Sequence, residues 1–101
     1  MKLFARQGDI YIFKVDSIKK ELTKTKKLVV AEGEVTGHKH QLISDNDFYF
    51  AEEDNGYMVK LIETTPLKHE EHKTIVLEPG QYQFSRQREY DPIQYQRSVA
   101  D

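Results

Sequence analysis

The sequence predicts a small all-β protein, built as an antiparallel sandwich or barrel. Three observations favour this class: short runs of β-branched and aromatic residues, alternation of apolar and polar residues within several runs, and turn residues at close intervals between them. The chain has 101 residues, of which 38% are apolar and 32% charged. This length suits one domain, 1–101, with a thin core that needs nearly every large apolar side chain.

The first half of the chain contains most of the expected strands. They cover residues 9–15 (DIYIFKV), 28–32, 34–43, 48–51 and 57–62. The last two flank Asn55 and Gly56, which tolerate the positive φ angles of a tight hairpin turn. Residues 16–27 carry only Ile18 and Leu22 as apolar residues at helical spacing, so a short exposed helix and a loose loop both fit.

The second half contains two clearly alternating strands. Residues 74–78 and 81–86 are separated by the turn residues Pro79 and Gly80. Residues 91–101 also alternate, after Pro92, and two interpretations stay open for them: an edge strand, or an arm that reaches a second subunit of a homo-oligomer.

Composition excludes several classes of protein. The chain has no cysteine, so a disulfide framework and a thiolate metal site are both ruled out, and any metal must be held by histidine and carboxylate. No apolar run approaches the roughly 20 residues that cross a bilayer, and nothing resembles a signal peptide, so we expect a cytoplasmic protein without a membrane partner. The net charge of −2 argues against nucleic acid as a partner.

All four histidines fall in two short segments. On a strand, His38 and His40 point to the same side, one pleat apart. His69 and His72 are three residues apart and lie on opposite faces of a regular strand, unless Glu70 and Glu71 form a turn or bulge. We therefore expect three or four imidazoles at one site, with Glu34, Glu70 or Glu71 as carboxylate, suited to Zn, Fe, Mn or Ni.

Two other interpretations of the histidines remain. Neutral imidazoles can hydrogen-bond a ligand without metal or serve as a general acid and base. Isolated histidines are also common as surface residues or as hydrogen-bonded core residues.

A second candidate group follows the last clear strand, in the sequence SRQREY. Arg86 and Arg88 share a face if the strand continues, and two guanidinium groups suit a small anionic ligand. Tyr90 completes this candidate ligand-binding set, although core packing is its simpler role. The alternative is a charged strand end in which the arginines pair with Glu89 and Asp91.

The blocks GEVTGHKHQL, LKHEEHKTIVLEPGQYQFSRQREYDP and RSVAD resemble a family of short, uncharacterised bacterial and phage proteins. That resemblance implies relatives but no activity. More distantly, the H-x-H strand with a later histidine and a Pro-Gly turn is similar to the cupins, small metal-binding β-barrels. The cupin resemblance implies His38 and His40 as the first ligands and His69 or His72 as the third. The glutamate that cupins carry shortly after the pair is missing, and this chain has Ser44, Asp45 and Asp47 there.

Two hypotheses of function follow. The first is a cupin-like domain whose histidine site, with or without a divalent metal, binds or acts on a small anionic ligand; the sequence does not specify a reaction. The second is a non-enzymatic structural or binding protein, for instance a phage-related component, that self-associates through β edges.

Overall fold

The computed structural model describes residues 2–32 and 37–86. Within these ranges the chain forms eight strands and no helix, which confirms the all-β prediction. The strands are β1 (Lys2–Gln7), β2 (Ile10–Lys14), β3 (Thr23–Glu32), β4 (Lys39–Glu53), β5 (Gly56–Leu61), β6 (Thr65–Lys68), β7 (Ile75–Leu77) and β8 (Gly80–Arg86). No helix in this part of the chain is long and apolar enough to cross a membrane.

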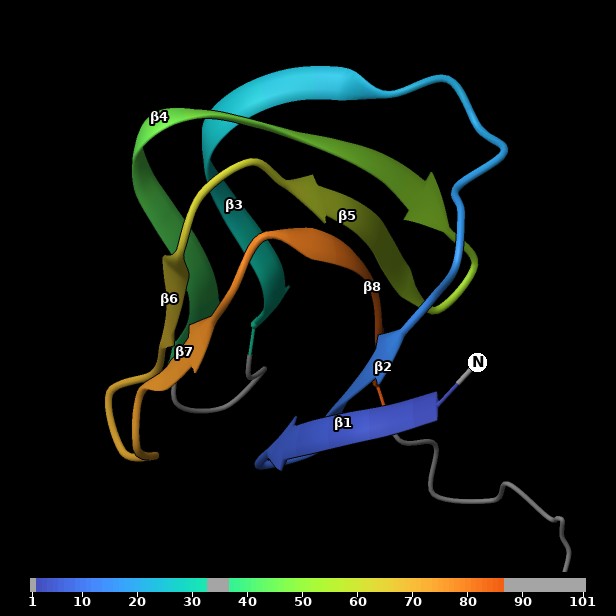
Figure 1. Ribbon diagram of the computed structural model, residues 1–101. Coiled ribbons are helices and arrows are strands. Elements are labelled where there is room, and N and C mark those ends of the chain that lie inside the picture. Colours follow the sequence, from blue (N-terminus) through green and yellow to red (C-terminus); the bar gives the residue numbers. More distant parts are fainter. Residues whose placement is uncertain (1, 33–36, 87–101) are drawn as a thin grey trace, which may run out of the picture.

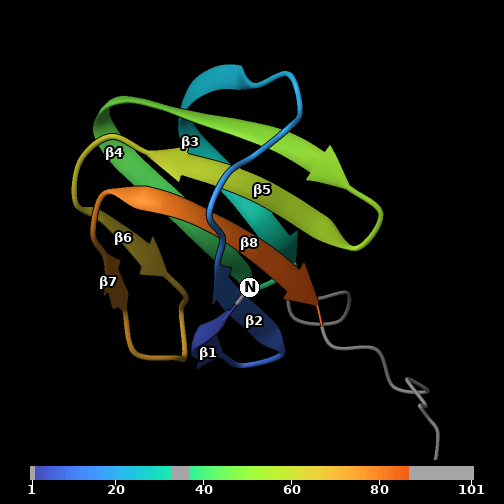
Figure 2. The same cartoon turned by 45° about the vertical axis from the view of Figure 1, so that its right-hand side comes forward.

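The strands form one antiparallel sheet that curls into a nearly closed barrel (Figure 1). The order along the sheet is β1-β2-β8-β5-β4-β6-β7, and β3 pairs with β4 outside this path. Figure 2 shows β4, β5 and β8 side by side across one wall, with β3 behind them. Because β1 and β7 end the path, the barrel closes only where these ends approach each other.

Strand β4 is the longest element and has three partners. It pairs with β3 on one edge and, on the other, first with β6 at Gln41 and Leu42 and then with β5 from Tyr49 onward. The sequence predicted two strands here, 34–43 and 48–51, since the polar run from Ser44 to Asp47 separates two apolar groups. The structure joins them into one bent strand from Lys39; residues 34–36 lie outside the described residues.

Alternate side chains of β2 to β8 point into the barrel and form its core. These residues are Ile10, Ile12, Leu28, Val30, Leu42, Phe48, Val59, Leu61, Leu67, Leu77, Tyr82 and Phe84. Their period of two is the signal that the sequence carried for strands with one buried face. A barrel with this narrow interior is filled by side chains, which explains why 38% apolar residues suffice.

Of the two interpretations left open for residues 16–27, the short helix is wrong, and residues 16–22 form a loop. Thr23 and Thr25 pair with Phe50 and Phe48 of β4, so the second part of this segment begins β3. A helix with only Ile18 and Leu22 on its apolar face buries too little surface to offset the cost of nucleation. The first part is instead fixed to β8, because the Gln81 side chain donates to Asp16 O and accepts the Ile18 N–H.

The predicted hairpin between 48–51 and 57–62 is present, with its turn one residue earlier than expected. Asp54 and Asn55 form the turn, and Gly56 is the first residue of β5. A Cβ atom at Gly56 would lie 1.8 Å from Phe84 O, so glycine is needed here for close approach of two backbones. Two short strands, β1 and β6, were not predicted at all.

One side chain bridges the gap between the two ends of the sheet. Gln7, the last residue of β1, is buried, and its Nε2 donates to Leu67 O of β6 at 3.0 Å and to Lys73 O at 2.8 Å. We call this junction of β1 with β6 and the loop after it the seam. The four histidines lie at the seam.

Candidate functional site

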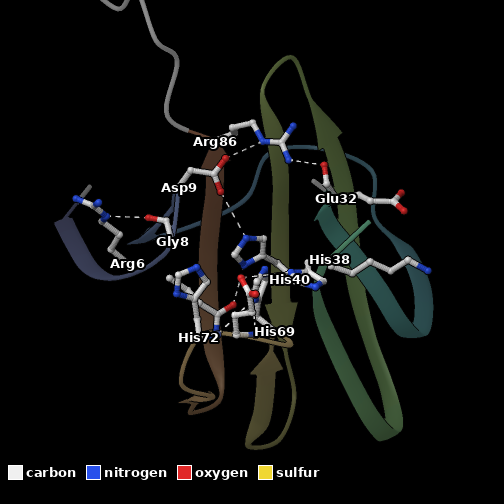
Figure 3. Close-up of polar contacts among 12 residues, drawn as sticks. Arg6, Gly8, Asp9, Glu32, His38, His40, His69, His72 and Arg86 are labelled. Carbon is white, nitrogen blue, oxygen red and sulfur yellow. Dashed lines mark hydrogen bonds and ion pairs between the residues drawn. The ribbon is translucent and has the colours of Figure 1, made fainter. Parts of the chain in front are cut away.

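The structure brings His38, His40, His69 and His72 together, and we call these four residues the histidine cluster (Figure 3). The ring centroids of His40 and His69 are 4.3 Å apart, those of His69 and His72 4.5 Å, and those of His38 and His69 5.6 Å. The His40 and His72 rings are stacked at 6.1 Å. Two chain segments that are about 30 residues apart therefore meet at one place.

Strand alternation and a turn set the directions of these rings. His40 follows the inward pattern of β4 two residues before Leu42, and only 3% of its surface is exposed. His69 and His72 do not belong to a strand, because residues 70–72 bend after β6. His69 Nδ1 accepts the backbone N–H groups of Glu71 (3.0 Å) and His72 (3.3 Å), which holds both rings on the same side.

The turn between β1 and β2 closes the other side of the cluster. Gly8 has φ of +60°, and a Cβ atom there would lie 2.7 Å from His72 Nε2 and 3.4 Å from His40 Cε1. Glycine is therefore required at this position for its backbone conformation and for the space that the rings occupy.

Gln7 fixes the tautomer of His40. Since the amide nitrogen of Gln7 already donates to two carbonyl groups, its Oε1 is the atom that faces His40 Nδ1, at 2.8 Å. An amide oxygen only accepts, so His40 Nδ1 carries the proton. In the neutral ring, Nε2 then keeps its lone pair.

Asp9 lies on the Nε2 side of His40, with its Oδ1 3.5 Å from the nitrogen. Burial, and then the neighbouring His69, lower the pKa of His40 from 6.5 to about 4, although Asp9 acts in the opposite direction. His40 is therefore neutral at pH 7. The lone pair of Nε2 and the carboxylate of Asp9 face each other as two acceptors, an arrangement that favours a cation or a proton donor between them.

A second group in the cluster has the composition of a metal site. His38, His69 and Glu70 each offer one ligand atom, and these atoms lie within 4.8 Å of one another. Glu70 Oε1 accepts the Lys39 backbone N–H at 2.9 Å, which orients the carboxylate and lowers its pKa. Glu71 also lies near His38, with its Oε1 3.5 Å from Nδ1.

Arg86 belongs to the same region but is already engaged. Its Nε lies 3.2 Å from Asp9 Oδ2, outside hydrogen-bonding angles, and its Nη2 donates to Glu32 O at 2.8 Å (Figure 3). The guanidinium thus holds the Asp9 carboxylate next to His40. Its predicted companions Arg88 and Tyr90, the segment 91–101 and Glu34 lie outside the described residues.

A comparison of the sequence with known families decides the relationship. The profile of one family matches residues 6–87. The chain belongs to the family described as Domain of unknown function (DUF8820). This match covers all strands from β2 to β8 and all four histidines, which supports the expectation of an uncharacterised family. Neither the curated proteins nor the solved structures contain a significant match to this DUF8820 domain.

Sequence reasoning missed three residues of the site, namely Gln7, Gly8 and Asp9. The only local signal is a glycine between two polar residues ahead of a strand, which indicates a turn but no function. Their roles depend on contacts with residues that follow 31 to 77 positions later in the chain, as in the contacts of Asp9 with His40 and with Arg86.

Proposed function

We propose that this domain binds a divalent transition-metal ion at the histidine cluster. The observation that carries the proposal is the group formed by His38, His69 and Glu70, whose ligand atoms lie within 4.8 Å of one another. Two imidazoles and a carboxylate leave coordination positions open, as in sites where a metal binds or activates a further ligand. Nitrogen and oxygen ligands suit Zn, Fe, Mn or Ni.

The distances between the ligand atoms show how far the side chains must move to bind a metal ion. Ligand nitrogens about 2.0–2.1 Å from a tetrahedral zinc ion are roughly 3.3 Å apart, so the group has to contract by about 1.5 Å. Glu70 is exposed and the two rings are half-buried, so rotation of side chains can supply this movement. Coordination through His69 Nε2 also requires the ring to move its proton to Nδ1 and to release the N–H groups of Glu71 and His72.

His40 supports the proposal from the buried side of the cluster. Because the pKa of His40 is about 4, its Nε2 offers a lone pair at neutral pH and has no proton to lose on binding a metal. Its Nδ1–H is held by Gln7, and metal-binding histidines usually donate their second ring nitrogen in this way. Asp9 beside Nε2 adds negative charge that attracts the ion.

Cupin-like coordination by His38, His40 and a third histidine is the finer form of this proposal. In that form the metal would lie beside His40 Nε2 and Asp9, on the buried side of the cluster. In the group of His38, His69 and Glu70 the metal would lie nearer the surface. We propose the surface group as the first binding position, since only there do three ligand atoms converge among the described residues.

Elemental analysis tests the proposal. Untagged protein is stripped with chelator, loaded separately with Zn²⁺, Ni²⁺, Mn²⁺ and Fe²⁺, dialysed and measured. We expect about one equivalent of metal in the parent, and loss of the metal in the His38→Ala/His69→Ala variant and in Glu70→Gln. Glu71→Gln is the matched control, since this neighbouring carboxylate lies outside the ligand group, and it should keep the metal. Substoichiometric metal in the parent, or full occupancy in both ligand variants, would contradict the proposal.

A second candidate, self-association in a structural or phage-related role, has its own supporting observation. Strand β1 ends the sheet path, pairs with β2 on one edge only, and exposes Leu3 (56%) and Phe4 (42%). The edge of a strand that has no strand partner is a template for pairing with another chain. Analytical ultracentrifugation of the parent and of Leu3→Lys/Phe4→Lys tests this role. A monomeric parent excludes it.

A further inference from the structure

A hollow lies on the outer face of the barrel, over β8 and the hairpin of β4 and β5. Its volume is about 270 Å³, and its lining consists of Lys20, Glu53, Asp54, Asn55, Gln83 and Ser85. Along β8, Tyr82 and Phe84 are buried in the core, so Gln83 and Ser85 point outward into this lining. No lining residue belongs to the histidine cluster or to the metal group, so the hollow is a separate candidate site.

The chain segment between β2 and β3 borders this hollow. Figure 2 shows the segment passing in front of β8 and β5 on its way to β3. Lys20 attaches it to the end of β4, because the ammonium group forms an ion pair with Glu53 and donates to Glu52 O at 3.0 Å. The Gln81 side chain holds the start of the same segment at β8. Since the segment is attached at both places, the border of the hollow is already formed in the folded domain.

Two aromatic rings of β2 stand beside the hollow. Tyr11 pairs with Ser85, and Phe13 pairs with Gln83. Side chains directly opposite each other in an antiparallel pair lie on the same face, with Cβ atoms about 4.5–5.5 Å apart. Both rings are half-buried, and they meet edge to face at 6.4 Å. The Arg6 guanidinium lies 5.6 Å from the centre of the Tyr11 ring, so this ring is packed between fixed neighbours.

The polar groups of the lining suit a neutral ligand. The Gln83 amide and the Ser85 hydroxyl make no side-chain hydrogen bond with the rest of residues 2–32 and 37–86, so both can donate to a ligand and accept from it. Lys20 and Glu53 compensate each other's charge, and Asp54 adds one carboxylate. This carboxylate repels a phosphate or a carboxylate ligand, whereas a hydroxyl group can donate to it.

A sugar combines the properties that this site requires. Its ring carries several hydroxyl groups, which both donate and accept hydrogen bonds, and an apolar face of C–H groups that packs on an aromatic ring. The volume of the hollow lies just below the range of about 300 to 1,000 Å³ for drug-sized ligands, so it suits a single ring.

We propose that this hollow is a carbohydrate site, in which one neutral sugar ring packs against Tyr11 and Phe13. Gln83, Ser85 and Asp54 then form hydrogen bonds with the hydroxyl groups of that ring. The site goes beyond the proposed metal binding and does not depend on it, because the two share no residue.

Titrations followed by ¹H–¹⁵N NMR, with chelator in every sample, test the carbohydrate site. The probes are glucose, galactose, mannose, N-acetylglucosamine, cellotetraose and chitotetraose. The site variants are Tyr11→Leu/Phe13→Leu and Gln83→Ala/Ser85→Ala. Tyr49→Leu and Gln41→Ala are the matched controls, since both side chains point outward from β4 but lie outside the hollow. We expect a saccharide to shift the amide signals of residues 11–13 and 83–85 in the parent and in the controls, and to bind each site variant about tenfold or more weakly.

The two site variants remove the rings and the polar groups separately, and circular dichroism checks that each is folded, so one folded variant is enough for the test. If no saccharide of the panel binds the parent, or if all variants bind it equally, the proposal is overturned. A single-stranded oligothymidylate is titrated in parallel. If it binds this face in place of any saccharide, and more weakly as salt is added, the surface belongs to nucleic acid and the carbohydrate site is again refuted.

Discussion

The buried, neutral His40 makes the stability of this protein depend on pH in a defined interval. In the unfolded chain the pKa of His40 is the ordinary 6.5, and in the folded protein it is about 4. Between these values the unfolded chain binds a proton that the folded protein does not bind. The free energy of unfolding therefore falls as the pH falls from about 6.5 to about 4, and the contribution of His40 is complete above about pH 6.5.

The magnitude follows from the same two values. At 1.36 kcal/mol for each pKa unit, the interval corresponds to about 3 kcal/mol. The free energy of unfolding of a native protein is typically only about 5–15 kcal/mol, so a loss of this magnitude is easily measured. His40 is almost completely buried, so solvent screens this effect little.

Urea unfolding of the parent and of His40→Gln, in the presence of chelator, isolates this contribution. Every other titrating group is common to both proteins, so the difference between their free energies of unfolding should shrink by about 3 kcal/mol between pH 7 and pH 4. Glutamine keeps a donor for Gln7 but does not titrate. If the two proteins lose stability in parallel over this interval, His40 is not held neutral by burial and the argument for its free lone pair fails.

Four further substitutions test the packing around the site and in the β4–β5 hairpin. Gly8→Ala should destabilise the protein by about 1–3 kcal/mol, because alanine is strained at a positive φ and its Cβ displaces His72. Gly37→Ala is the control: its φ is +73° but a Cβ there has no atom within 4 Å, so it should cost only about 1 kcal/mol. Thermal unfolding compares the two variants. Gln7→Leu leaves the Leu67 and Lys73 carbonyls without their donor and should cost about 2–4 kcal/mol in urea unfolding. Gly56→Ala should prevent accumulation of folded protein, which circular dichroism detects, because its Cβ overlaps Phe84 O.

Local alternation explains which parts of the fold could be predicted. Tyr82 and Phe84 were expected on one face of a strand, and both are buried in β8. β1 gave no such signal, because it is an edge strand whose Leu3 and Phe4 are exposed. The sequence analysis also predicted two strands where the structure has the single strand β4. On one edge, β4 changes its partner from β6 to β5 around the polar run after Ile43. Local alternation of apolar and polar residues gives no information about such a change of partner.

The candidate site also has a part that the sequence predicted and a part that it did not. Histidine is scarce in this chain, so its two tight clusters stood out in the sequence, and the expectation that Glu70 and Glu71 must turn for both His69 and His72 to reach one place agrees with the observed bend. Gln7 and Asp9 were not found, since a polar residue in a turn has no pattern that distinguishes support of a site from exposure to solvent. Their function arises from the closure of the barrel.

Because the histidine cluster lies at the seam, ligand binding to the cluster is linked to the folding of the whole barrel. Gln7 joins the first strand to a loop 66 residues later, so this junction connects parts of the chain that are far apart in the sequence. A ligand that binds the folded cluster and not the unfolded chain would stabilise the whole barrel. Saturation at a hundred times its dissociation constant would add about 2.7 kcal/mol to the unfolding free energy, so a melting curve alone can screen for the natural ligand.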